Sequence, residues 1–124
     1  MKKLFNRLLI PTLLITCIYI VSCATFTRDA YRTLSVSKET YTATISTIND
    51  LYKQRLVAPE DYQKIMSLAR DYQYFHNKSV DALTLYKQNN EPSFKEIYQK
   101  YAVKLGETLS KIIEESKQYL EMTK

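Results

Sequence analysis

Two prolines divide most of this chain into three segments of similar length, and each segment repeats its apolar residues at helical spacing. Pro59 and Pro92 fall where the apolar pattern breaks, and Gly106 is the single glycine of the chain. Because proline and glycine disfavour helices more than other residues do, their scarcity favours long, uninterrupted helices. The three expected helices span residues 27–57, 59–88 and 93–122.

The apolar residues of each segment lie three and four positions apart, which lines one face of a helix. Short turns bring the apolar stripes of consecutive antiparallel helices face to face. With the first turn centred just before Pro59, Tyr41 is expected opposite His76, and His76 opposite Leu105. The sequence thus predicts an all-α fold, an elongated antiparallel three-helix bundle over residues 27–124.

Local signals mark several of the expected helix ends. Pro59 suits the first position of a helix, and Asn89 and Asn90 suit a left-handed helix end. Ser93 and Glu96 have the spacing of a capping box, so the third helix is expected to begin there. The many threonines of the first segment leave a β-strand as the alternative in that part of the chain.

The first 23 residues have the order of a secretory signal peptide, with a basic start, an apolar run and small residues at the end. Lys2, Lys3 and Arg7 precede an apolar run over residues 8–21. The alternative is an uncleaved transmembrane helix, which needs about 20 consecutive apolar residues. The run is shorter than that, and Pro11 interrupts it, so export is the favoured interpretation.

The end of this segment, Ile20-Val21-Ser22-Cys23, resembles the lipobox of bacterial lipoproteins. In that family the cysteine thiol receives a diacylglycerol, the peptide before it is removed, and the new amino terminus is usually acylated as well. The resemblance therefore implies a covalent lipid on Cys23, palmitate included, and a cleaved helical, apolar signal peptide over residues 1–22.

The same resemblance implies an exported protein that its lipid holds on the bilayer. Two or three acyl chains, at about 0.8 kcal/mol per buried methylene, make such an anchor effectively permanent. Residues 23–26 are the expected lipidated tether, and Ala24, in place of the Asp common in inner-membrane lipoproteins, implies the outer membrane if the source has two membranes. Cys17 is the alternative lipidation site, although Thr16 before it is branched where the family has a small residue.

Catalytic chemistry has few candidate residues after the signal peptide. The remaining stretch of about 100 residues suits one small domain and contains a single histidine, His76, and no free cysteine. Neighbouring acids such as Glu114 and Glu115 point in different directions on a helix, so they cannot act as a carboxylate pair. We expect no enzyme activity, no metal centre and no cofactor besides the lipid.

The charge pattern does not indicate a nucleic-acid partner. The net charge of +5 includes Lys2, Lys3 and Arg7, which leave with the signal peptide, and both signs alternate along the rest. The expected partners are the lipid bilayer and a protein of the cell envelope. The expected function is a membrane-anchored protein-interaction module.

Tyrosine is the most distinctive residue type, with 11 copies against no tryptophan. A ring that is buried while its hydroxyl reaches water suits a narrow bundle, so packing is one explanation. The other is a recognition surface, because tyrosine is enriched at interfaces. Rings gathered on an outer face would favour recognition.

Two further functions stay open. Tyr41 and His76 are expected in one layer beside Gly106, either as a buried hydrogen bond or as a small polar cavity that binds a ligand. The chain also ends in Lys124, which makes it similar to the lipid-anchored murein lipoproteins that are joined to peptidoglycan through a C-terminal lysine. A terminal lysine can equally serve to complement a helix dipole.

The lipid anchor gives the first testable prediction. Cys23→Ala should yield an unprocessed precursor that incorporates no radiolabelled palmitate, because the acceptor thiol is gone. Cys17→Ala is the control and should leave both processing and labelling unchanged. Palmitate incorporation that survives Cys23→Ala would contradict the lipoprotein prediction.

Overall fold

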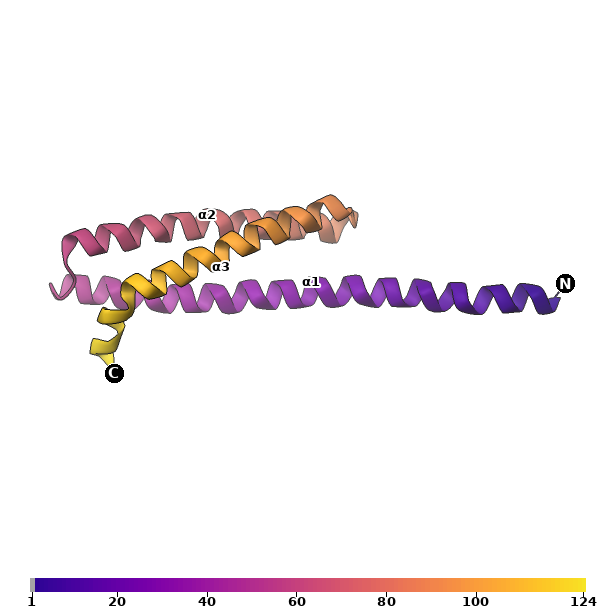
Figure 1. Cartoon of the computed structure of the whole chain (residues 1–124), viewed down its shortest axis with the longest axis horizontal. Coiled ribbons are helices and arrows are strands. Elements are labelled where there is room, and N and C mark those ends of the chain that lie inside the picture. The colour runs from indigo at the N-terminus through magenta and orange to yellow at the C-terminus, as the bar shows by residue number, and fades with distance from the viewer. Residues whose placement is uncertain (1) are drawn as a thin grey trace. The chain divides into compact units, whose positions relative to one another are not determined.

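The structure is a computed structural model that describes the backbone from Lys2 to Lys124 and the side chains from Thr25 onward. This part of the chain is all-helical, as predicted, so the β-strand alternative is wrong. The elements are α1 (Lys2–Lys53), α2 (Pro59–Asn89), α3 (Pro92–Leu120) and the short 3-10 helix η1 (Glu121–Thr123) (Figure 1).

Two compact units make up the chain, and Arg32 is the last residue of the first. The first unit contains the amino-terminal part of α1, including the residues predicted to form the signal peptide and tether. The second unit, Thr33–Lys124, contains the rest of α1 together with α2, α3 and η1. This second unit is the predicted antiparallel three-helix bundle.

The carboxyl end of α1 sets the geometry of the first turn. The helix ends at Lys53, one turn before the predicted residue 57. The amide of Leu56 donates to the carbonyl of Leu51, and that of Arg55 to Tyr52, both at 2.9 Å, with Arg55 in the left-handed region at φ 63°. These two bonds form a Schellman motif, in which glycine is the usual left-handed residue. The sequence has no glycine there, so the early end was not predicted.

This early end moves α1 by about one turn against α2. Tyr52 stacks on Tyr62, with ring centroids 3.8 Å apart, and the Tyr62 hydroxyl donates to Asn49 at 2.9 Å. The predicted register, which places Tyr41 opposite His76, instead places Tyr52 opposite Ile65. The helices are antiparallel as expected, but the predicted facing pairs of α1 and α2 are wrong by about one turn.

The ends of α2 and α3 agree with the prediction in part. α2 begins at Pro59 and is closed by Asn90, whose left-handed backbone (φ 54°) lets its amide donate to Tyr86 at 2.7 Å. α3 begins at Pro92, with Glu91 as the N-cap and no side-chain cap hydrogen bond. The predicted capping box of Ser93 and Glu96 is therefore wrong. Proline, which has no amide hydrogen to satisfy, takes the first helical position instead.

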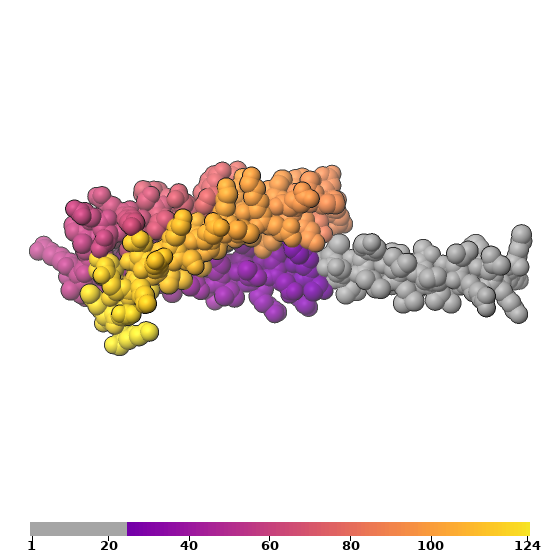
Figure 2. Space-filling view, viewed as in Figure 1, coloured from indigo at the N-terminus to yellow at the C-terminus, as the bar shows by residue number. Residues whose placement is uncertain are grey.

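One stripe of each helix forms the core of the bundle. Tyr72, Ile48, Ile65, Leu83 and Ile112 are the largest fully buried side chains. Most positions of the predicted stripes of α2 and α3 are buried, whereas Tyr31, Tyr52 and Arg55 of the predicted α1 stripe are exposed. Figure 2 shows α2 and α3 packed side by side along the viewed face of the bundle. The other buried residues of the second unit are Leu34, Tyr41, Thr44, Leu51, Val57, Ala69, Ser79, Ala82, Tyr86, Tyr98, Leu105, Thr108, Ser116 and Tyr119.

Two buried serines differ in how their hydroxyls are satisfied. Ser79 of α2 and Ser116 of α3 both have no exposed surface. Ser79 donates to the carbonyl of Phe75 at 2.8 Å, whereas the Ser116 hydroxyl has no hydrogen-bond partner. A buried hydroxyl without a partner costs about 1–3 kcal/mol.

This difference predicts the effect of two matched substitutions. Ser116→Ala should raise the free energy of unfolding by about 1 kcal/mol, since it removes an unsatisfied polar group and improves helix propensity. Ser79→Ala should stabilise less or slightly destabilise, because it also removes a hydrogen bond. Urea unfolding followed by circular dichroism measures both. Equal effects of the two substitutions would contradict the conclusion that the Ser116 hydroxyl, unlike that of Ser79, has no hydrogen-bond partner.

Candidate functional site

The predicted polar layer is rearranged by the register of α1. Tyr41 stacks on Tyr72, with ring centroids 4.1 Å apart and planes 9° apart. The Tyr41 hydroxyl donates to the carbonyl of Ala69 at 3.4 Å, and the Tyr72 hydroxyl lies 2.7 Å from Ser37 Oγ. The expected hydrogen bond from Tyr41 to His76 is therefore replaced, because Tyr72 occupies the position that the predicted register assigns to His76.

His76 lies one turn further along α2 and is half-buried. Its ring stacks against Tyr72 at 5.9 Å. Burial and the nearby charge of Lys38 lower the pKa of His76, while a hydrogen bond with the Leu34 backbone opposes this shift. Tyr41 and His76 thus contact the same ring. Ligand binding beside His76 stays a prediction.

Gly106 does not join this layer. It is exposed, and a Cβ atom added to it would meet no other atom within 4 Å. The missing side chain therefore does not open a cavity between packed residues, which the predicted polar cavity requires. Of the three residues expected together, the structure brings Tyr41 and His76 to Tyr72 and leaves Gly106 on the surface.

The two functions predicted near the ends of the chain, lipidation at Cys23 and a peptidoglycan link at Lys124, do not involve this layer. The side chain of Cys23 lies outside the described residues, so lipidation stays a prediction. Lys124 is exposed after η1. Among the side chains of residues 25–124, no cluster of three or more His, Cys, Asp or Glu could hold a metal ion, and no helix in that part is both long and apolar enough to cross a membrane.

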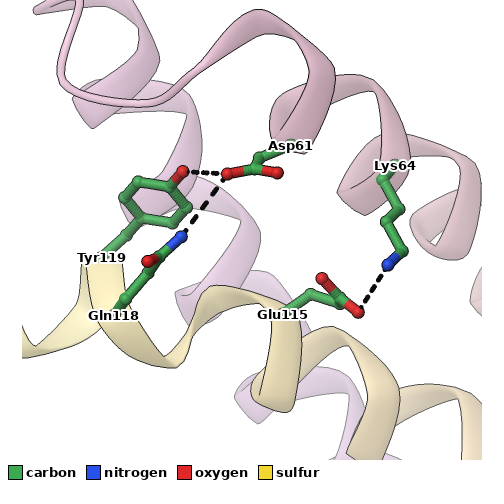
Figure 3. Close-up of polar contacts among 5 residues, drawn as sticks. All are labelled: Asp61, Lys64, Glu115, Gln118 and Tyr119. Atoms are coloured by element: carbon green, nitrogen blue, oxygen red, sulfur yellow. Dashed lines mark hydrogen bonds and ion pairs between the residues drawn. The ribbon is translucent and has the colours of Figure 1, made fainter.

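Polar contacts join the start of α2 to the end of α3 (Figure 3). Lys64 Nζ lies 2.8 Å from Glu115 Oε1, and Asp61 accepts hydrogen bonds from the Tyr119 hydroxyl and, at 3.4 Å, from Gln118. The hydrogen bond to the Asp61 carboxylate is the main cause that raises the pKa of Tyr119. These pairs lie within two positions of the predicted register of α2 and α3. Their polar groups satisfy one another, so we assign them to helix pairing.

A group of three rings, one exposed and two half-buried, lies where α2 meets α3. This aromatic cluster consists of Tyr74 and Phe75 of α2 and Tyr101 of α3. Tyr74 is edge-on to Phe75 at 5.5 Å and to Tyr101 at 6.4 Å, and Phe75 lies 6.3 Å from Tyr101. Edge-to-face pairs at such distances add about 0.5–1.5 kcal/mol each. The cluster is therefore ordered by its own contacts, although Tyr74 keeps 53% of its surface in solvent.

Two lysines, one from each helix, lie over the rings of the aromatic cluster. Lys78 Nζ is 5.7 Å from the centroid of Tyr74, and Lys104 Nζ is 5.7 Å from that of Phe75. Among the described residues, neither ammonium group has a carboxylate within 4.0 Å. Each cation–π contact contributes about 0.5–1 kcal/mol at an exposed site. The rings thus hold two positive charges beside apolar surface.

Sequence interpretation missed this cluster for a definite reason. The apolar stripe of α2 includes Tyr72 and His76 and leaves Tyr74 and Phe75 outside, so their rings were not paired with Tyr101. The available signal was a tyrosine outside the stripe with a lysine four residues later, Lys78, on the same helix face. Only the packing of α3 against α2 brings the third ring and Lys104 to them.

The geometry of the cluster suits recognition of another molecule. It combines exposed ring area, phenolic hydroxyls and positive charge on two rigid helices. Comparison with protein-family models, with curated proteins and with solved structures gives no match.

The buried tyrosines predict how stability depends on pH. Burial raises the pKa of Tyr72 above its ordinary value of 10.0, against the opposing hydrogen bond from Ser37. Burial likewise raises the pKa values of Tyr41 and Tyr98. The unfolded chain then releases these phenolic protons first, so the free energy of unfolding should fall as the pH rises above 10.0.

Tyr72→Phe tests whether the buried phenol of Tyr72 contributes to this pH dependence, since phenylalanine preserves the ring stack and has no phenolic proton. The fall in stability at alkaline pH should be shallower in the variant than in the unmodified chain, as measured by urea unfolding at a series of pH values. An identical fall in both would exclude Tyr72 as a contributor.

Proposed function

We propose that this chain is a lipid-anchored interaction module of the bacterial cell envelope, with the aromatic cluster as its protein-binding surface. The observation that carries the proposal is the exposure of Tyr74, which keeps 53% of its surface in solvent while its ring packs against two others. Exposed aromatic rings in a defined arrangement are typical of binding surfaces, because they add contact area at little cost in conformational entropy.

The neighbouring apolar residues support a larger surface than the rings alone. Ile97 is 41% exposed and lies one turn before Tyr101 on α3. Leu85 is 39% exposed and lies three turns after Tyr74 on α2. Helical spacing places Ile97 on the same face of α3 as Tyr101, and Leu85 on the same face of α2 as Tyr74. Together they extend the apolar area along both helices, as the core of an interface requires.

The expected lipid on Cys23 attaches the chain, and with it this surface, to a membrane. A protein held on a membrane meets other envelope proteins at a higher effective concentration than one that diffuses freely. Even a modest affinity at the aromatic cluster is then sufficient for binding. The lipobox resemblance and the exposed cluster therefore support the same kind of function, although they lie in different units of the chain.

Site-specific photo-crosslinking in intact cells tests the proposal. A photoreactive residue in place of Tyr74 should form a discrete adduct with an envelope protein, because this position lies at the centre of the proposed surface. Val103 is the matched control, since it is also exposed, at 61%, and lies on α3 outside the cluster. The same residue there should give little adduct.

Two comparisons complete this experiment. Cys23→Ala should reduce the adduct at Tyr74, because the unanchored chain meets its partner less often. Absence of an adduct at Tyr74, or equal adducts at Tyr74 and Val103, would exclude the aromatic cluster as the binding surface.

A further inference from the structure

We infer that the aromatic cluster recognises an acidic segment of its partner, in which a carboxylate lies next to an aromatic or aliphatic side chain. This inference rests on the proposed function and specifies the chemistry of the partner. Lys78 and Lys104 lie over the rings, and among the described residues neither ammonium group has a carboxylate within 4.0 Å.

The two lysines define where negative charge is favourable. Each ammonium group lies 5.7 Å from a ring centroid, Lys78 over Tyr74 and Lys104 over Phe75. They come from different helices, so a ligand that contacts both must lie across the line where α2 meets α3. By comparison, Lys64 near the other end of this line is already paired with Glu115 at 2.8 Å.

The rings decide which acidic ligand fits. Lys78 and Lys104 are both exposed, so their charges are available to a ligand at the surface, and a carboxylate forms a stronger hydrogen bond with an ammonium group than a neutral acceptor does. The exposed face of Tyr74 offers apolar contact beside the charge. A segment with alternating acidic and apolar side chains satisfies both features, whereas a purely acidic segment leaves the ring area uncovered.

Direct binding to synthetic peptides tests this inference. The full chain, in neutral detergent micelles, is titrated into a fluorescent peptide in which Asp and Glu alternate with Phe and Leu. Two comparison peptides replace the acids with Lys or with Ser. The acidic peptide should bind most tightly, and added salt should weaken its binding, because the attraction is between exposed charges.

Charge reversal identifies the residues responsible. Lys78→Glu combined with Lys104→Glu should weaken binding of the acidic peptide by about tenfold or more and transfer the preference to the Lys peptide. The matched control reverses two exposed lysines away from the cluster, Lys53→Glu and Lys111→Glu, and should change binding less than about twofold. Circular dichroism verifies that both variants keep the helical fold.

The outcomes separate this inference from the proposed function. Equal binding of the three peptides, or equal effects of the two double variants, would refute the acidic partner. So would a loss of binding to phosphatidylglycerol vesicles on cluster reversal without any peptide preference, which would assign the lysines to lipid headgroups. If the Tyr74 adduct forms in cells while the acidic preference is absent, the interaction function stands and only the partner chemistry fails.

Discussion

The left-handed turn at Arg55 is the constraint on which the packing of α1 and α2 depends. It ends α1 at Lys53, and the two backbone hydrogen bonds that close the helix fix where the chain leaves it. A helix that ended one turn later would place His76 against Tyr41. With the observed end, Tyr72 takes that place, and the hydroxyls of both tyrosines find partners. The left-handed backbone conformation of Arg55 therefore determines which polar contacts form in the core.

Tyrosine serves two purposes in this bundle, and exposure separates them. In the narrow core, rings such as Tyr72 provide apolar area while their hydroxyls reach polar atoms near the surface, so burial leaves few polar groups unsatisfied. Where α2 meets α3, Tyr74 and Tyr101 pack against Phe75 instead, with Tyr74 exposed and Tyr101 half-buried. The packing explanation therefore holds for the buried rings, and the exposed group is the one that supports recognition.

The aromatic cluster is suited to binding because it needs no rearrangement to present its rings. Each ring is fixed by the others and by the helix that carries it, so a partner orders few side chains when it binds. The lysines over the rings add charge selectivity, and the expected lipid restricts the search to one membrane. In this proposal, the lipid keeps the chain close to other envelope proteins, the helices hold the rings in place, and the aromatic cluster with its lysines selects the partner.

The amino-acid sequence alone determined the all-α class, the three antiparallel helices and the stripes of the core, because apolar spacing and the positions of Pro59 and Pro92 are local signals. It also carries the lipobox resemblance at Cys23, which concerns a short contiguous motif. The tertiary structure decided the register of α1 against α2, because the left-handed residue that ends α1 is Arg55 rather than glycine and so has no recognisable signal in the sequence. It also decided the aromatic cluster, whose residues lie on two helices and meet only through the packing of side chains far apart in the sequence.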